Sequence, residues 1–225
     1  MKWNKLYKYP ASMRTSIEGK RHYEITGKKL PSVTTILSAT KSQEAIDSIN
    51  RWKARVGEDQ ATRVKDQAAS RGTNMHYHLE KYILGEGHKD LTDEGQVAGD
   101  MAQVIIDKGL CDLSEIWGSE VTLYYPGLYA GATDLVGVYD YEDSIIDFKQ
   151  SNKPKKRQWL GDYFLQLVAY SEAHNELHGS NINKGVVLMC TKDYKFQEFI
   201  LEDDEFKQQK DLWWKRVETY YMDKY

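Results

Sequence analysis

The chain of 225 residues is poor in proline and cysteine and has no long apolar run. Four prolines and no Gly/Ser-rich stretch leave no evident linker, which favours a single domain over residues 1–225. Two cysteines, Cys111 and Cys190, lack CxxC spacing. They exclude a four-cysteine zinc site or iron–sulfur cluster and suit a reducing compartment. No segment approaches a membrane span of about 20 apolar residues, and the N-terminal MKWNKLYKYPASM has no signal-peptide core. A cytoplasmic protein without a membrane partner is expected.

Excess charge of one sign is also absent. The formal net charge is −3, so the molecule as a whole is not a basic nucleic-acid binder. Any such role requires a local basic patch, and acidic stretches such as LEDDE at 201–205 would mask that patch in the total.

Hydrophobic periodicity divides the chain into three sections. Residues 1–30 alternate around Gly19 and Gly27 like a small hairpin, and residues 31–112 form a helical section with helices over 42–57, 58–72, 73–87 and 93–108. Residues 113–225 form a catalytic sheet with flanking helices. Strands are predicted over 115–127, 128–140, 143–150, 183–192 and 194–201, with helices over 159–177 and at the C-terminus. The pattern predicts an α/β fold with a mixed sheet flanked by helices.

Two of the predicted strands contain charged residues that would share one face. Strand side chains alternate, so Asp147 and Lys149 point to one side, and pairing with the preceding strand would bring Asp134 beside them. Buried charges must pair or bind a metal, so a salt-bridged triad or a solvent-facing edge are simpler explanations. Carboxylates are also hard oxygen ligands for Mg²⁺ or Mn²⁺, and a neighbouring lysine can stabilise charge on a phosphate.

Other polar residues recur at helical spacing. His76 and Glu80 lie at i and i+4 of one predicted helix, and Gln166 and Tyr170 do so in another. Glu120 lies on the strand before Asp134. Taken singly, each of these residues has an ordinary structural explanation.

Together, these residues resemble a known family. An acidic residue followed by (D/E)xK is the pattern of the PD-(D/E)xK nuclease superfamily. The order of histidine helix, Asp strand, DFK strand and QxxxY helix resembles its RecB-type branch. The similarity to the mitochondrial genome-maintenance exonuclease family is closer. It rests on LPSVTTIL (30–37), RWKARV (51–56), RGTNMH with LE (71–80), GATDLV (131–136), DFKQSNKPK (147–155) and LQLVAY (165–170).

This resemblance implies a restriction-endonuclease-like fold and a metal-dependent exonuclease that degrades single-stranded DNA from free ends. His76, Asp134, Asp147 and the backbone carbonyl of Phe148 would ligate one or two Mg²⁺ or Mn²⁺ ions, with Glu120 as a further candidate. Lys149 would be the catalytic lysine. Gln166 and Tyr170 would organise the site by holding the lysine or the DNA near the scissile phosphate.

A mitochondrial protein would carry a targeting extension, so a bacterial or phage relative is expected, acting in the bacterial or phage-infected cell. It would be a monomer, with replication or recombination proteins as possible partners. Two basic segments are candidates for phosphate contacts, and an aromatic residue beside one of them could stack on unpaired bases. The proposed DNA-binding residues are Arg51, Lys53, Arg55, Arg71, Lys153, Lys155, Lys156, Arg157 and Trp159.

Other functions fit the same residues. A structure-specific endonuclease or a double-strand exonuclease could use this fold. A non-catalytic DNA-binding protein would have no need of buried charges at Asp134, Asp147 and Lys149. A metalloenzyme with another substrate would leave the basic residues after Lys149 unexplained.

Overall fold

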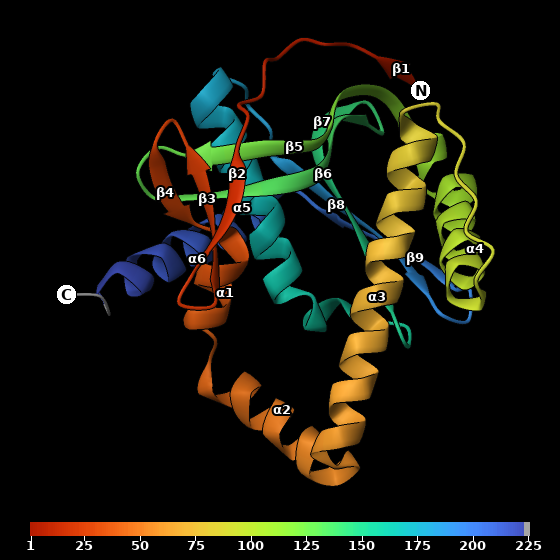
Figure 1. The fold of residues 1–225 in the computed structure, drawn as a ribbon. Coiled ribbons are helices and arrows are strands. Elements are labelled where there is room, and N and C mark those ends of the chain that lie inside the picture. The colour runs from red at the N-terminus through yellow and green to blue at the C-terminus, as the bar shows by residue number, and fades with distance from the viewer. Residues whose placement is uncertain (223–225) are drawn as a thin grey trace.

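The structure, a computed structural model, describes residues 1–222 and has a six-stranded mixed sheet at its centre (Figure 1). The last three residues of the predicted domain, 223–225, lie outside the described residues. Strands β5, β6 and β7 form an antiparallel meander. Strand β8 runs parallel to β7 because helix α5 (Gly161–His178) returns the chain between them. The order across the sheet is β1 (Lys2–Trp3), β5 (Leu113–Tyr125), β6 (Tyr129–Tyr139), β7 (Glu142–Ser151), β8 (Lys184–Thr191) and β9 (Phe196–Leu201).

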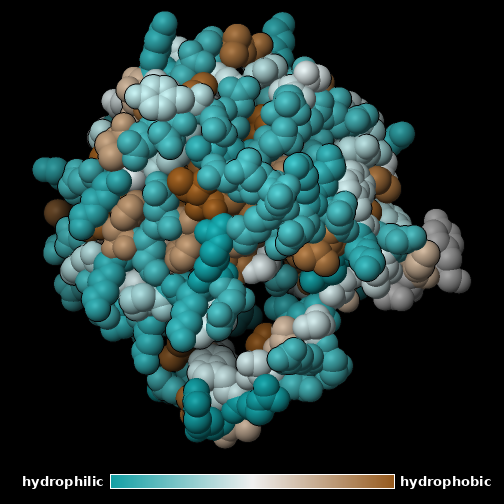
Figure 2. Space-filling model, turned by 180° about the vertical axis from the view of Figure 1, so that it is seen from behind, coloured by the Kyte–Doolittle hydropathy of each residue, from teal (hydrophilic) through white to brown (hydrophobic). Residues whose placement is uncertain are grey.

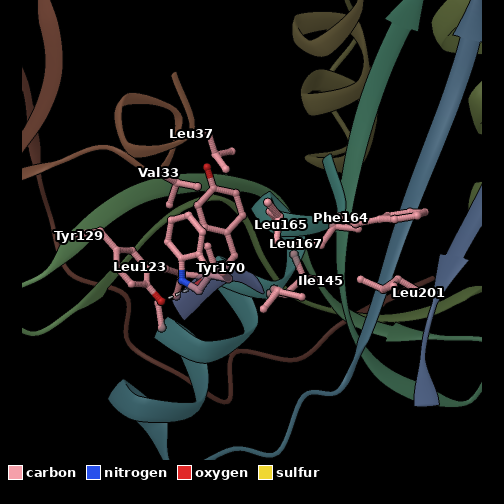
Figure 3. Packing of buried hydrophobic residues seen from close by; sticks show 14 of the residues in the cluster. Val33, Leu37, Leu123, Tyr129, Ile145, Phe164, Leu165, Leu167, Tyr170 and Leu201 are labelled. Carbon is pink, nitrogen blue, oxygen red and sulfur yellow. Dashed lines mark hydrogen bonds between the residues drawn. The ribbon is translucent and has the colours of Figure 1, made fainter. Parts of the chain in front are cut away.

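Helices cover both faces of this sheet (Figure 1). Helices α1 (Val33–Ala39), α5 and α6 (Asp203–Met222) pack on one face, and α3 (Glu58–Ile83) and α4 (Asp93–Lys108) on the other. Alternate residues of β6 supply the two cores, since Val136 packs on the α5 side and Leu135 on the α3–α4 side. On the α5 side the Tyr129 hydroxyl donates to the Ala169 carbonyl oxygen at 3.0 Å (Figure 3). The predicted fold class, a mixed sheet flanked by helices, is confirmed.

Two short 3₁₀ helices, η1 (Leu110–Asp112) and η2 (Arg157–Trp159), complete the helical elements of residues 1–222. No helix in that range is both long and apolar enough to span a membrane.

The N-terminal section forms a second, three-stranded antiparallel sheet of β2 (Met13–Ile17), β3 (Lys20–Ile25) and β4 (Lys28–Pro31). Both turns depend on the glycines seen in the sequence, since Gly19 and Gly27 adopt φ of 73° and 78°. The segment is therefore longer than a single hairpin. Its buried residues Tyr23, Ile25 and Leu30 pack against Ala130 of β6, which attaches this sheet to the central one.

Helix α3 differs from the prediction. Two helices with a break at Gly72 were expected, but α3 is continuous through this glycine. Gly72 lies where the helix passes close to β7, because a Cβ atom there would be 3.3 Å from the Gln150 side chain. This glycine permits a close helix–strand approach and does not end the helix.

Helix α2 (Gln43–Val56) projects from the body of the protein (Figure 1). It has no buried residue and packs mainly on α3. In the view from behind, the largely hydrophilic surface is hollowed above this projecting part (Figure 2).

A buried histidine lies on the face of α5 that meets the N-terminal segment. His174 is fully buried, and its two ring nitrogens lie 3.2 Å from the Tyr9 hydroxyl and 2.6 Å from the Ser180 hydroxyl. Tyr7 and His178 pack against the same ring. Burial lowers the pKa of His174 to about 3, and the neighbouring His178 adds to this shift.

We expect His174 to destabilise the protein in acid. The pKa is depressed in the folded state, so the stabilisation is complete above the unfolded value of about 6.5 and is lost as pH falls toward the folded value. Between about pH 7.5 and pH 5 the loss is about 2 kcal/mol, measurable by urea unfolding in EDTA. The His174→Gln protein should lose this part of the pH dependence, whereas His88→Gln should keep it. An unchanged dependence in His174→Gln would contradict the assignment.

Candidate active site

A cavity of about 600 Å³ lies beside the first half of β6 and the second half of β7, between the N-terminal sheet, α3 and α5. The side chains predicted from the sequence for metal binding and catalysis meet in it, and they are His76, Glu120, Asp134, Asp147, Lys149, Gln166 and Tyr170. Glu80, one helical turn from His76, also lines the cavity. At Phe148 the predicted ligand is the backbone carbonyl, and the side chain packs in the α3–α4 core.

The cavity lies where strands β6 and β7 are no longer paired. The last pair between them is Leu135 with Ile146, and the next residue on each strand is an aspartate, Asp134 or Asp147. Beyond that point, the Phe148 amide donates to Asp134 Oδ2 at 2.6 Å. The carboxylate thus satisfies a backbone group of β7 that β6 no longer reaches, which fixes its position.

Helix α3 and strand β5 supply the other candidate metal ligands. His76 Nδ1 lies 3.3 Å from Asp134 Oδ1. Glu120 occupies the left-handed region at φ 52°, which is uncommon for a residue other than glycine and is often found at functional sites. One ligand atom each from His76, Glu120 and Asp134 lies within 4.8 Å of the others, which suits a single cation.

Lys149 lies between the carboxylates and α5. Its ammonium forms an ion pair with Asp147, and its Nζ lies 5.2 Å from the centre of the Tyr163 ring. One turn along α5, Gln166 Nε2 donates to the Tyr170 hydroxyl at 3.1 Å. The Tyr170 ring needs the glycine opposite it, since a Cβ at Gly131 would approach within 2.7 Å of the ring.

The charges in the cavity are strongly coupled. Burial raises the pKa of Asp147 to about 6 although Lys149 opposes the shift, and burial with repulsion from Asp134 raises that of Glu120 to about 7. Burial alone would lower the pKa of His76, but Asp134 outweighs it and raises the value to about 9. The pKa of Lys149 is likewise raised, because attraction to Asp147 outweighs burial. The pKa of Asp134, in contrast, is lowered, because His76 and Lys149 outweigh its burial.

The predicted DNA-binding residues are dispersed. Lys153, Lys155 and Trp159 line a hollow of about 430 Å³ beside the cavity, and Lys156 Nζ lies 5.5 Å from the centre of the Trp159 ring. Arg157 is paired with Glu205 and donates to the Ile200 carbonyl oxygen at 2.5 Å.

Four arginine and lysine residues lie elsewhere. Arg71 donates to Gln150 Oε1 at 3.1 Å and to Asn152, so it joins α3 to the end of β7. The remaining three, on the exposed surface of α2, are not brought to the cavity; they are Arg51, Lys53 and Arg55.

The sequence analysis missed several residues of the cavity. Tyr163 lies at helical spacing from Gln166 and Tyr170, so the rule that paired those two could have included it. No local pattern pointed to Arg14 and Arg21, because only folding brings the N-terminal sheet beside β6.

Comparison with known proteins gives sequence relatives. The chain is 28% identical over 191 residues to mitochondrial genome maintenance exonuclease 1 of Xenopus tropicalis, which covers 80% of this chain and 53% of that protein. The human protein of the same name is 28% identical over 177 residues, covering 73% of this chain and 50% of its own length. The chain thus spans about half the length of these relatives.

No protein-family profile matches the chain. A solved structure of a candidate exonuclease from Eubacterium rectale is similar to the chain, with a TM-score of 0.48 and 13% identity over 67% of both chains. The sequence relatives confirm the resemblance inferred from the motifs. The chain is therefore similar in sequence to mitochondrial genome maintenance exonuclease 1, at 28% identity over 73–80% of its own length.

Proposed function

We propose that the protein is a metal-dependent exonuclease that hydrolyses phosphodiester bonds of single-stranded DNA from free ends. The supporting observation is the convergence of four carboxylates, an imidazole and a lysine in one cavity bordered by basic residues. The exonuclease part of the proposal is also supported by the names of the sequence relatives.

The donor set fits a divalent cation. Carboxylate oxygens with one imidazole suit Mg²⁺ or Mn²⁺, and the raised pKa values of Asp147 and Glu120 reflect negative charge that a cation would relieve. His76, Glu120 and Asp134 would hold the ion, with Asp147 beside them. A bound ion supplies Lewis-acid polarisation of the phosphoryl oxygens and lowers the pKa of its water.

The other residues position the substrate and balance its charge. Lys149 is protonated at neutral pH because its pKa is raised, so it is suited to stabilise charge on the phosphate and not to act as a general base. Tyr163 and Asp147 hold the ammonium in place. The Gln166–Tyr170 pair restrains the two side chains that form the α5 wall beside the lysine.

The shape of the molecule supports the single-strand and free-end parts of the proposal. Residues of the N-terminal sheet, α1, α3, α5 and strands β5, β6 and β7 line the cavity, so it has walls on several sides. A single backbone fits between such walls more readily than a duplex does. The rival function, internal cleavage by an endonuclease on the same fold, would require an open cleft.

Four substrates separate these functions. End-labelled linear single strands, circular single strands, blunt duplex and single-stranded RNA should be incubated with Mg²⁺, Mn²⁺ or EDTA. The linear DNA strand alone should be degraded efficiently, and only with a metal. Comparable cleavage of circular and linear strands would refute action from ends, and full activity in EDTA would refute the metal dependence.

A further inference from the structure

Two further hollows adjoin the cavity, and each shares lining residues with it. A second hollow of about 520 Å³ shares Arg21 and Thr34 with the cavity, and the hollow beside Trp159 shares Ala68, Gln150 and Tyr163 with it. The second and third hollows share no lining residue. The candidate active site therefore lies in the middle of a longer track.

The β2–β3 hairpin forms one end of this track and presents two arginines to it. Arg14 pairs in register with Tyr23, and Ser16 with Arg21, so Arg14, Arg21 and Tyr23 share one face of the hairpin. All three line the cavity. Diagonal neighbours on paired strands are about 7–8 Å apart, so both guanidinium groups can reach one extended ligand.

The guanidinium groups of these two arginines are not held by other residues of the protein. Within residues 1–222 neither group forms an ion pair or a side-chain hydrogen bond, and both residues are exposed. Arg71, Arg157 and Arg216 differ, since each is bonded to other side chains. Arginines that stabilised the fold would be expected to have comparable partners.

The backbone beneath Arg21 is held rigidly. Its carbonyl oxygen accepts hydrogen bonds from the Ser32 amide at 3.0 Å and from the Thr35 hydroxyl at 2.8 Å. Tyr23, two residues further on, is buried against Ala130 of β6. A rigid base reduces the entropy lost when a ligand orders the side chain.

We propose that Arg14 and Arg21 of the β2–β3 hairpin, together with Thr34 of α1, here called the hairpin arm, bind backbone phosphates of the substrate strand. The arm binds the part of the substrate strand that lies on the side of the cavity opposite Lys153, Lys155 and Trp159. Arginine binds phosphate through two parallel hydrogen bonds, and the Thr34 hydroxyl can donate a third. The identity of the ligand as DNA rests on the proposed function, whereas the location of the arm does not.

Binding without cleavage provides the test. Affinity of the wild-type protein for a labelled single-stranded oligonucleotide is measured by fluorescence anisotropy in EDTA at several salt concentrations. In the Arg14→Ala/Arg21→Ala protein, the slope of log affinity against log salt should become shallower by roughly 1.4, since each lost phosphate contact on a single strand removes about 0.7. The matched control is Lys28→Ala/Lys29→Ala, which removes two exposed charges of the same small sheet that line none of the hollows.

Hydrolysis provides a second readout. The arginine variant should lose roughly tenfold or more in kcat/KM on the oligonucleotide. Its rate on thymidine 5′-p-nitrophenyl phosphate, which offers a single phosphate and no flanking strand, should fall by a smaller factor than its rate on the oligonucleotide. Arg21→Lys should lose less than Arg21→Ala, because it retains the charge.

Equal salt slopes in the wild-type and double-arginine proteins would overturn the hairpin arm, whatever the activity. Failure of the proposed function has a different signature, namely a wild-type protein that hydrolyses neither substrate with any metal. The binding slopes would still decide the role of the arginines in that case.

Discussion

The Lys149→Ala protein should fold normally and degrade linear single-stranded DNA roughly 100- to 1000-fold more slowly than the wild type, with the loss in kcat. The ammonium of Lys149 lies between Asp147 and the Tyr163 ring, and alanine would leave no charged group at that position. Its raised pKa keeps it charged at neutral pH. Single-turnover rates in saturating Mg²⁺, with circular dichroism to verify the fold, measure the effect.

Lys192→Ala is the control, because it removes an exposed lysine paired only with its neighbour Asp193. It should leave the rate unchanged. Wild-type kcat in Lys149→Ala would exclude the lysine from the reaction even if the metal dependence is found.

The carboxylates should be tested with asparagine and not with alanine. Asp134 accepts the Phe148 amide, so Asp134→Ala would leave a buried donor unsatisfied at a cost of about 1–3 kcal/mol. Asp134→Asn retains an acceptor oxygen and removes the charge. Asp134→Asn and Asp147→Asn should both abolish detectable activity without unfolding the protein.

The second large effect is expected on Mn²⁺ affinity, which should fall in His76→Ala and not in His78→Ala, although both histidines belong to α3. His76→Ala should bind Mn²⁺ at least tenfold more weakly than the wild type, because it removes an imidazole beside Asp134 and Glu120. His78 lies on another side of the helix, where the centre of its ring lies 4.5 Å from that of the tilted His88 ring and where it packs against Gly99 of α4. His78→Ala should therefore retain Mn²⁺ affinity and lose only packing.

Isothermal titration calorimetry with Mn²⁺ measures both variants. Buffers of different ionisation enthalpy should also show that the wild type releases protons on binding, since a ligating imidazole must be neutral. Equal losses in the two variants would mean that His76 is not the ligand.

Some features of the fold cannot be predicted from local sequence, because they depend on contacts with distant parts of the chain. Gly72 was interpreted as a helix stop, but the nearby side chain of Gln150, from β7, shows that it permits a close approach. Strand β1 has only two residues and is recognisable only through its pairing with β5. Arg157 lies in a basic run, yet Glu205 of α6 neutralises it.

Sequence patterns were sufficient to predict the alternating faces of β6 and β7, the grouping of Asp134 with Asp147 and Lys149, and the family resemblance. These features depend on local periodicity and on residue types at short spacing, which each segment carries on its own. The tertiary structure alone decided which cations remain available to a ligand and that Arg14 and Arg21 face the cavity. Those properties depend on contacts between segments far apart in the chain, and packing in the folded protein determines which segments meet.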